Sequence, residues 1–167
     1  VPGSATDFVK TFAIANDVNI VFGLTELDLS NNNIYNTQVL IRPNGEFVKY
    51  RKRNLNQTDL DNKIVAGTQF VTAEIDGVKA AMFICSDMQS ASITKEMTNA
   101  KVDVILQSLT TTTDLNASIS YVGMQMNTWI VFANRFGDEG YFNYTGFSHI
   151  INPVGTICNR SLGKNSY

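Results

Sequence analysis

The sequence predicts a layered α/β domain built around a mixed sheet. Three short, mostly apolar runs, at 80–84, 102–106 and 129–133, are typical of buried strands, and the run 80–84 has no polar face at all. Helical patterns separate these runs, which favours parallel strand–helix–strand units. Tight turns such as Asp76-Gly77 instead join neighbouring strands into antiparallel hairpins. The two kinds of connection together indicate an α/β fold with a mixed sheet.

The first half of the chain opens with a helix expected over 5–16. Phe8 and Phe12 stand at helical spacing, and Ser4 is a candidate N-cap. Turn residues such as those at 43–45 then divide a series of short β segments. We expect these strands at 18–23, 34–41, 46–51, 70–75 and 78–84. The polar stretch 54–67 is expected to be a loop.

The second half continues the pattern of alternating strands and helices. We expect helices over 90–99 and 115–127, and between and after them two apolar strands. Two further strands flank an Asn152-Pro153-Val154-Gly155 turn. The expected strands are 102–106, 129–133, 146–151 and 155–158. Neither an internal repeat nor a linker is visible, so residues 1–167 are expected to form one domain, in whole or in part.

Composition excludes several classes of function. The 167 residues include 13 basic and 15 acidic side chains, a balance that provides no basic surface for nucleic acid or an acidic membrane. No apolar run approaches the ~18 residues that span a bilayer. Two cysteines exclude a disulfide scaffold, and with a single histidine they have no zinc-binding spacing. We expect a cytoplasmic protein without a cofactor.

Three side chains are candidates for chemistry. Cys85 ends a buried strand and precedes a polar turn, a place where ligands collect in α/β sheets and where a helix N-terminus lowers a thiol pKa. The alternative is a structural cysteine. Lys52, where a strand runs out into a loop, could stabilise a thiolate or an oxyanion, or could belong to a solvated basic stretch. His149 could pair with Cys85 in a papain-like mechanism, although packing is the better interpretation.

A series of short motifs runs along nearly the whole chain. The motifs are Val21-Phe22-Gly23, Ile34-Tyr35-Asn36-Thr37, Pro43-Asn44-Gly45, Tyr50-Arg51-Lys52-Arg53-Asn54-Leu55, Gly67, Ile84-Cys85-Ser86-Asp87, Ala133-Asn134-Arg135-Phe136-Gly137 and the segment from Gly146 to Gly155. Each motif is only moderately specific, but their shared order and spacing resemble the carbon–nitrogen hydrolase (nitrilase) superfamily.

This resemblance implies a fold, a partner and a chemistry. The fold would be a two-sheet sandwich flanked by helices and paired across a dimer interface into a four-layered αββα arrangement. The chemistry would be hydrolysis of a small amide or nitrile by a Cys–Glu–Lys triad, with amides favoured. Cys85 matches the nucleophile and Lys52 the catalytic lysine, while the backbone N–H of Ser86 would help to stabilise the developing charge.

The sequence also departs from the family pattern at the general base. No glutamate matches the family's, and Glu26 is expected to be an ordinary surface residue. The domain is therefore expected to be truncated at its N-terminus. Its last strand and C-terminal tail are the second segment whose absence is considered. Asp59 and Asp61 are possible substitute bases, whereas Asp87 is expected to point away along its turn. Cys158 is expected to be less reactive than Cys85.

Two further departures lie around the expected site. Ser86 stands where the family commonly has an aromatic residue, and Met126-Asn127 stands where it usually has Glu-Asn. These departures support the alternative function, a non-catalytic pseudoenzyme or interaction subunit on the same scaffold. A Cys85–His149 acyltransferase is the third hypothesis, and it is disfavoured because His149 lies in a segment that resembles a late structural strand.

Overall fold

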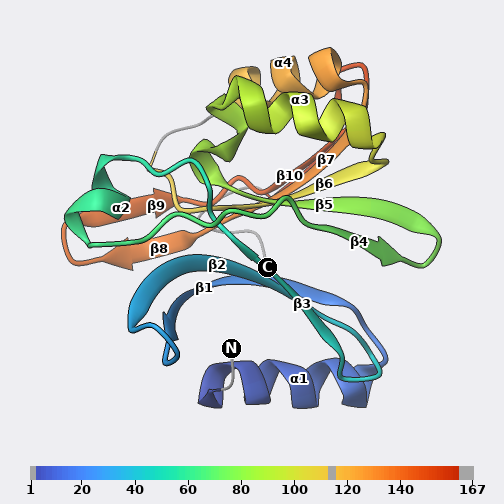
Figure 1. The fold of residues 1–167 in the computed structure, drawn as a ribbon. Helices are drawn as coiled ribbons and strands as arrows, with labels where there is room; N and C mark the ends of the chain where they lie inside the picture. Colours follow the sequence, from blue (N-terminus) through green and yellow to red (C-terminus); the bar gives the residue numbers. More distant parts are fainter. Residues whose placement is uncertain (1–2, 113–115, 162–167) are drawn as a thin grey trace.

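A computed structural model describes residues 3–112 and 116–161 of the chain. Figure 1 shows these residues stacked in layers: helix α1 (Ser4–Asn16) covers a small sheet, which faces a larger sheet, and helices α3 (Ala91–Ala100) and α4 (Asn116–Met126) cover the far side. Every layer belongs to the same chain, whereas the family resemblance assigned the four layers to a pair of chains. None of the described helices is both long and apolar enough to cross a membrane.

The small sheet is an antiparallel meander of three strands in the order β1-β2-β3. Gly45 closes the second hairpin in the left-handed region, at a φ of 80°. Its N–H donates a hydrogen bond of 2.9 Å to the Arg42 carbonyl. One face of β2 packs on α1 through Val39, Ile41 and Ala13. The strands are β1 (Ile20–Asp28), β2 (Asn33–Ile41) and β3 (Phe47–Arg51).

The large sheet is mixed, as the sequence predicts. Its order is β11-β10-β7-β6-β5-β4, with β5, β6 and β7 parallel and the outer pairs antiparallel. The parallel strands are the three apolar runs, which lie in the centre of the sheet. The strands are β4 (Thr72–Ile75), β5 (Val78–Ile84), β6 (Val104–Leu109), β7 (Trp129–Asn134), β10 (His149–Ile151) and β11 (Ile157–Arg160).

Alternation along β5 builds a core on each side of this sheet. Phe83 faces α3 and α4 and joins a cluster with Ile105 and Ile130. Met82 and Ile84 face the small sheet and pack with Leu40, Tyr50 and Ala73. The small sheet has three strands against six, so apolar side chains of β7 on the same side, Trp129 and Val131, remain 43% and 37% exposed. A complete two-sheet sandwich is therefore not evident in the described residues.

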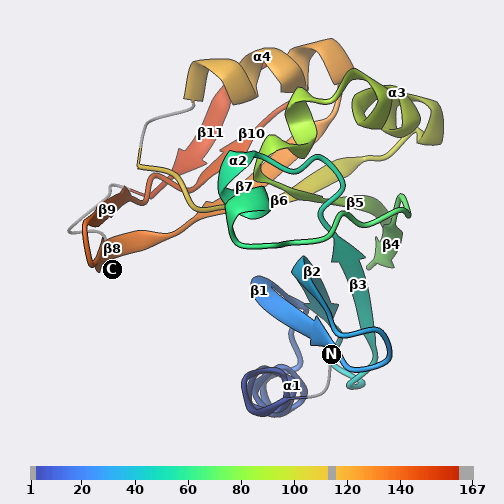
Figure 2. The same cartoon turned by 60° about the vertical axis from the view of Figure 1, so that its left-hand side comes forward.

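Several boundaries differ from the sequence prediction. Strand β1 continues to Asp28, the stretch 54–67 contains the short helix α2 (Gln57–Asp61), and β8 (Phe136–Glu139) and β9 (Phe142–Thr145) form an unpredicted hairpin. Figure 2 shows this hairpin projecting beyond the large sheet. Ser4 is not the N-cap, because α1 is preceded by Gly3 and has no side-chain cap. The first position of the helix expected over 115–127 lies outside the described residues.

Candidate active site

Cys85 sits at a sharp turn between a strand and a helical segment. Strand β5 ends at Ile84, and Cys85 begins η1, a 3₁₀ turn over Cys85–Gln89. Its φ of 46° lies in the left-handed region, which a non-glycine residue occupies only at an energetic cost. The Cys85 carbonyl accepts a hydrogen bond of 3.0 Å from Nε2 of the buried Gln107 on β6. The turn leaves Cys85 half-buried at the carboxyl end of the strand, as the sequence predicts.

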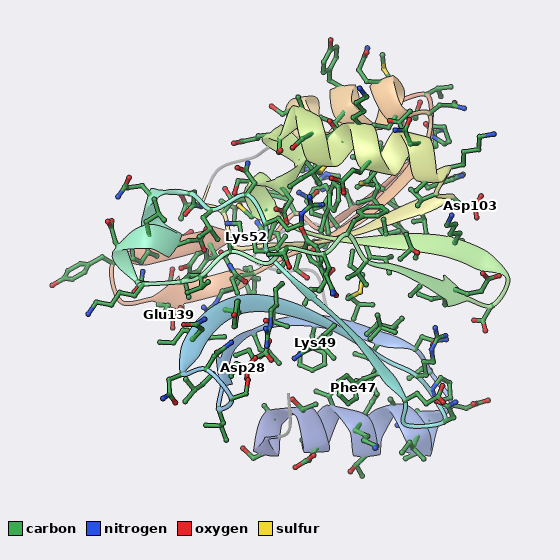
Figure 3. The ribbon with its side chains drawn as sticks, in the orientation of Figure 1. Asp28, Phe47, Lys49, Lys52, Asp103 and Glu139 are labelled. Atoms are coloured by element: carbon green, nitrogen blue, oxygen red, sulfur yellow. The ribbon has the colours of Figure 1, made fainter. Side chains whose placement is uncertain are left out.

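Lys52 directly follows β3, in the other sheet, and is only 1% exposed. Its backbone is fixed on both sides, because its N–H donates to the Asn36 carbonyl and its own carbonyl accepts from the Gly67 N–H, each at 2.8 Å. Its Nζ donates to Oδ2 of Asp59 at 2.5 Å. Figure 3 shows Lys52 on the side of the small sheet that faces the large sheet, with Lys49 toward α1.

Asp59 reaches the lysine because α2 folds back over it. Asn56 caps this helix: its Oδ1 accepts the Asp59 N–H at 3.0 Å, and the Asp59 carboxylate accepts the Asn56 N–H at 2.9 Å. Burial acts to raise the pKa of Asp59, but hydrogen bonds from Lys52 and Asn56 outweigh it and hold the pKa below its usual range. Asp61 is exposed and bonds Gln57 instead. Of the two aspartates, only Asp59 therefore lies at Lys52.

The thiol of Cys85 is electrostatically coupled to this ion pair. Burial raises the pKa of Cys85 above its ordinary value, while the positive charge of Lys52 and the N–H of Ser86 act to lower it. Asp59 and Asp87 act in the same direction as burial. The thiol is thus mostly protonated at neutral pH in this structure, and a catalytic role requires a base or a bound substrate to shift that balance.

A buried aspartate connects the segments that carry Cys85 and Lys52. The Asp87 carboxylate, fully buried, accepts hydrogen bonds from the Tyr50 hydroxyl and from the N–H groups of Arg53, Asn54 and Ile84. It therefore does not extend along the turn, as the sequence suggested, but turns inward toward the end of β3. Beside it, Ser86 and Asn54 exchange two side-chain hydrogen bonds of 2.6 Å with each other's carbonyl groups.

Comparison with known proteins identifies the family of this chain. The model of the carbon-nitrogen hydrolase family matches residues 1–166. The chain belongs to the carbon–nitrogen hydrolase family. It is 26% identical to a 2-oxoglutaramate amidase of Bacillus subtilis over 160 residues, which is 92% of this chain and 61% of the relative. It is 27% identical to a formamidase of Bacillus cereus over 169 residues, covering 93% of this chain and 48% of the relative.

Solved structures agree on the fold. An amidase from Nesterenkonia has a TM-score of 0.86 at 18% identity, over 98% of this chain and 64% of that chain. A nitrilase-superfamily protein of Saccharomyces cerevisiae also has a TM-score of 0.86, at 17% identity, over 100% of this chain and 64% of that one. Mutants of the Nesterenkonia amidase were solved with butyramide and with the acetamide moiety of fluoroacetamide on the active-site cysteine. This hydrolase-family chain spans less than two thirds of each of these four proteins.

Glu26 is not the surface residue that the sequence suggested. It is 5% exposed and bonds Lys49 and Arg51, both at 2.7 Å, and Thr37 at 2.8 Å. Burial acts to raise the pKa of Glu26, but these partners outweigh it and lower the pKa to about 2. Because side chains alternate along β3, this cluster lies on the α1 side of the small sheet, away from Lys52. Glu26 therefore does not supply the family's general base.

Two further glutamates form ion pairs with arginines. Glu96 pairs with Arg53, and Glu139 with Arg135. Within residues 3–112 and 116–161, no group of three or more His, Cys, Asp or Glu side chains could hold a metal ion.

His149 does not pair with Cys85. It lies on β10, buried and stacked on Phe132 with ring centroids 4.9 Å apart. The strands β7 and β6 separate β10 from β5, a distance of roughly 14 Å at the usual strand spacing. Cys158 is exposed, whereas Cys85 is half-buried, and the lower reactivity expected for Cys158 stays a prediction.

Two surface clefts on the described part of the chain lie away from the expected site, because neither is lined by Cys85 or Lys52. The larger, of about 400 Å³, lies between α3 and α4 and includes Met126. The smaller, of about 230 Å³, lies beside Lys49 and Arg51. Neither cleft therefore gives a small molecule access to the thiol of Cys85.

Proposed function

We propose that this chain carries the nucleophile and the charge-stabilising group of a hydrolase for small amides. One observation carries the proposal: a cysteine in a strained left-handed turn at the end of β5 is electrostatically coupled to the buried ammonium of Lys52. Strained backbone concentrates at functional sites, and a buried lysine beside a thiol suits oxyanion stabilisation. The match to the carbon–nitrogen hydrolase family supports this class of reaction.

In this mechanism the Cys85 sulfur attacks the amide carbon and forms a carbon–sulfur bond. The oxygen becomes an oxyanion, stabilised by the Lys52 ammonium and the Ser86 N–H. The carbon–nitrogen bond then breaks, and the proton taken from the thiol leaves with ammonia or an amine. Water attacks the resulting thioester, releases the carboxylic acid and returns the proton to the thiol.

The proton carrier of this mechanism is a glutamate that the described residues do not supply at the site. Asp59 is the nearest carboxylate to Lys52, but its ion pair and its lowered pKa make it a weak base. We therefore assign Asp59 to the orientation of Lys52, with the base contributed from elsewhere in the complete protein. Without it, turnover by this chain is expected to be slower by ~10²–10⁴-fold.

Relatives favour amides over nitriles as the substrate class. The matches described above include an amidase that acts on 2-oxoglutaramate by name, a formamidase and an amidase solved with butyramide. We further propose that residues 1–167 are one part of a single αββα domain, and that the complete protein is a cytoplasmic homo-oligomer.

The test uses fluoroacetamide, a weak electrophile that requires an activated thiol, and a panel of small amides. Mass spectrometry after incubation should show the acetamide adduct on Cys85 and none on Cys158, and Lys52→Met should slow the labelling. Ammonia release from formamide or butyramide should be slow and should disappear in Cys85→Ala. Equal release by Cys85→Ala, or labelling of Cys158 alone, would refute the proposal.

A non-catalytic scaffold is the second candidate, and a specific observation favours it. Burial raises the pKa of Cys85, and no described glutamate lies beside the thiol. The same experiment separates the two functions. A scaffold leaves Cys85 unlabelled by fluoroacetamide in the complete protein as well as in this chain, whereas the enzyme labels at Cys85 and gains turnover in the complete protein.

A further inference from the structure

The two proposed reactive groups belong to different sheets, so their separation depends on what joins the sheets. Lys52 follows β3 in the small sheet, and Cys85 follows β5 in the large sheet. These strands form no ladder with each other, because β5 pairs only with β4 and β6. Contacts other than the sheet ladders must therefore set the distance between the ammonium and the thiol.

We propose that Asp87 is the positioning residue that fixes Cys85 relative to Lys52 by clamping the ends of β3 and β5 together. This inference rests on the proposed function. The Asp87 carboxylate is fully buried. Its Oδ2 accepts from the Tyr50 hydroxyl at 2.8 Å and from the Ile84 N–H at 3.0 Å.

The other carboxylate oxygen completes the clamp. Asp87 Oδ1 accepts from the N–H groups of Arg53 at 3.2 Å and Asn54 at 2.8 Å. The two oxygens together thus have donors on both sides of Lys52 in the sequence, Tyr50 before it and Arg53 and Asn54 after it. The fourth donor, the Ile84 N–H, belongs to the residue directly before Cys85. Three of the four bonds connect residues more than 30 positions apart, so this is more than a local cap on the η1 turn.

The chemistry of the four partners explains why an aspartate is present. Each partner presents a hydrogen-bond donor, and an ionised carboxylate only accepts. An asparagine of the same shape would turn an NH₂ group toward donors and leave at least one buried N–H unsatisfied, which costs about 1–3 kcal/mol. The reciprocal bonds between Ser86 and Asn54 lie alongside and strengthen the same junction.

The test measures the rate of iodoacetamide alkylation of Cys85 as a function of pH, by peptide mass spectrometry, in the intact chain. The variants are Asp87→Asn and Tyr50→Phe, with Asp7→Asn on the remote helix α1 as the control. The exposed Cys158 serves as an internal standard in every sample. Far-UV circular dichroism verifies that each variant is folded.

The sign of the change separates positioning from a direct charge effect. The Asp87 charge itself acts to raise the pKa of Cys85, and the Lys52 charge acts to lower it. If Asp87 acted only by its charge, Asp87→Asn would lower the thiol pKa and speed alkylation. If Asp87 holds the ammonium in place, its loss raises the thiol pKa and slows Cys85 alkylation at pH 7.5 by roughly three- to tenfold.

Tyr50→Phe makes the milder test, because it removes one donor and keeps the carboxylate. Positioning predicts a smaller slowing in the same direction, of about twofold or more, with Cys158 and Asp7→Asn unchanged. Should Asp87→Asn fail to fold, this variant decides the question. Unchanged or faster Cys85 alkylation in folded Tyr50→Phe would overturn the inference. Alkylation needs no turnover, so the expected slowing together with a complete protein that has no Cys85-dependent amidase activity would refute the proposed function alone.

Discussion

Replacing Asp59 by asparagine should destabilise the protein strongly, because it leaves the Lys52 ammonium buried without a counter-charge. The two groups are 2.5 Å apart, and their side chains are 1% and 8% exposed. At an effective dielectric constant of 20, this separation corresponds to a gross attraction of about 7 kcal/mol. Desolvation of both charges offsets most of it, but removal of one partner from a buried pair usually costs about 3–5 kcal/mol.

Two controls separate the ion pair from the cap of α2. Asn56→Ala removes the Oδ1 acceptor for the Asp59 N–H and leaves the ion pair, so it should cost only about 1 kcal/mol. The double variant Lys52→Met/Asp59→Leu removes both charges and should recover most of the stability lost in Asp59→Asn. Urea denaturation at pH 7, followed by circular dichroism, gives the free energy of unfolding for each variant.

The effect should also depend on pH in a defined direction. The pKa of Asp59 is lowered in the folded state, so its contribution is present above the unfolded value of ~3.9 and is lost as the pH falls below it. The stability difference between the parent and Asp59→Asn should therefore shrink below about pH 4. A cost below 1 kcal/mol at pH 7, or no recovery in the double variant, would refute this account of the ion pair.

Three further predictions follow from buried contacts. The pKa of Glu26 is lowered from 4.5 to about 2, so its contribution to the free energy of unfolding should disappear as the pH drops through this interval. In Glu26→Gln, the urea concentration at the unfolding midpoint should therefore depend less on pH in this range. A Cβ at Gly67 would overlap a backbone carbonyl oxygen, so Gly67→Ala should cost about 1–3 kcal/mol in urea denaturation, whereas Gly3→Ala, with no atom within 4 Å, should be near neutral. Gln107→Leu removes the donor to the Cys85 carbonyl and should slow fluoroacetamide labelling of the Cys85 thiol. An unchanged labelling rate would show that this hydrogen bond does not position the thiol.

The strands were the most predictable part of this fold because their signals are local. Mostly apolar runs marked β5, β6 and β7, and turn residues marked the hairpins before them. The β8–β9 hairpin escaped because its strands bury little and its apolar side chains are exposed, as Tyr141 and Phe142 show at 105% and 60%. The helix α2 escaped because its capping box, Asn56 with Asp59, stands in a polar stretch without helical periodicity.

At the site, the sequence predicted where Cys85 stands along the chain, but not the contacts of the buried acidic residues. The position of Cys85 at a strand end and the alternation along β3 both follow from the sequence. The burial of Glu26 and the inward turn of Asp87 depend on partners 11 to 37 positions away, which a single sequence does not reveal. A signal was nonetheless present for Asp87, since an acidic residue two positions after a buried strand needs donors if it remains inside.

The left-handed backbone at Cys85 bears on how this chain could change over evolutionary time. A cysteine held at a φ of 46° gives up about 1–2 kcal/mol relative to a glycine, which adopts that conformation freely. Cys85→Gly should therefore be more stable than Cys85→Ala, although both lack the thiol. A lineage released from any need for this sulfur would gain stability by a single substitution at the turn. A glycine or asparagine at position 85 would relax this turn, but it would remove the thiol on which the proposed reaction depends.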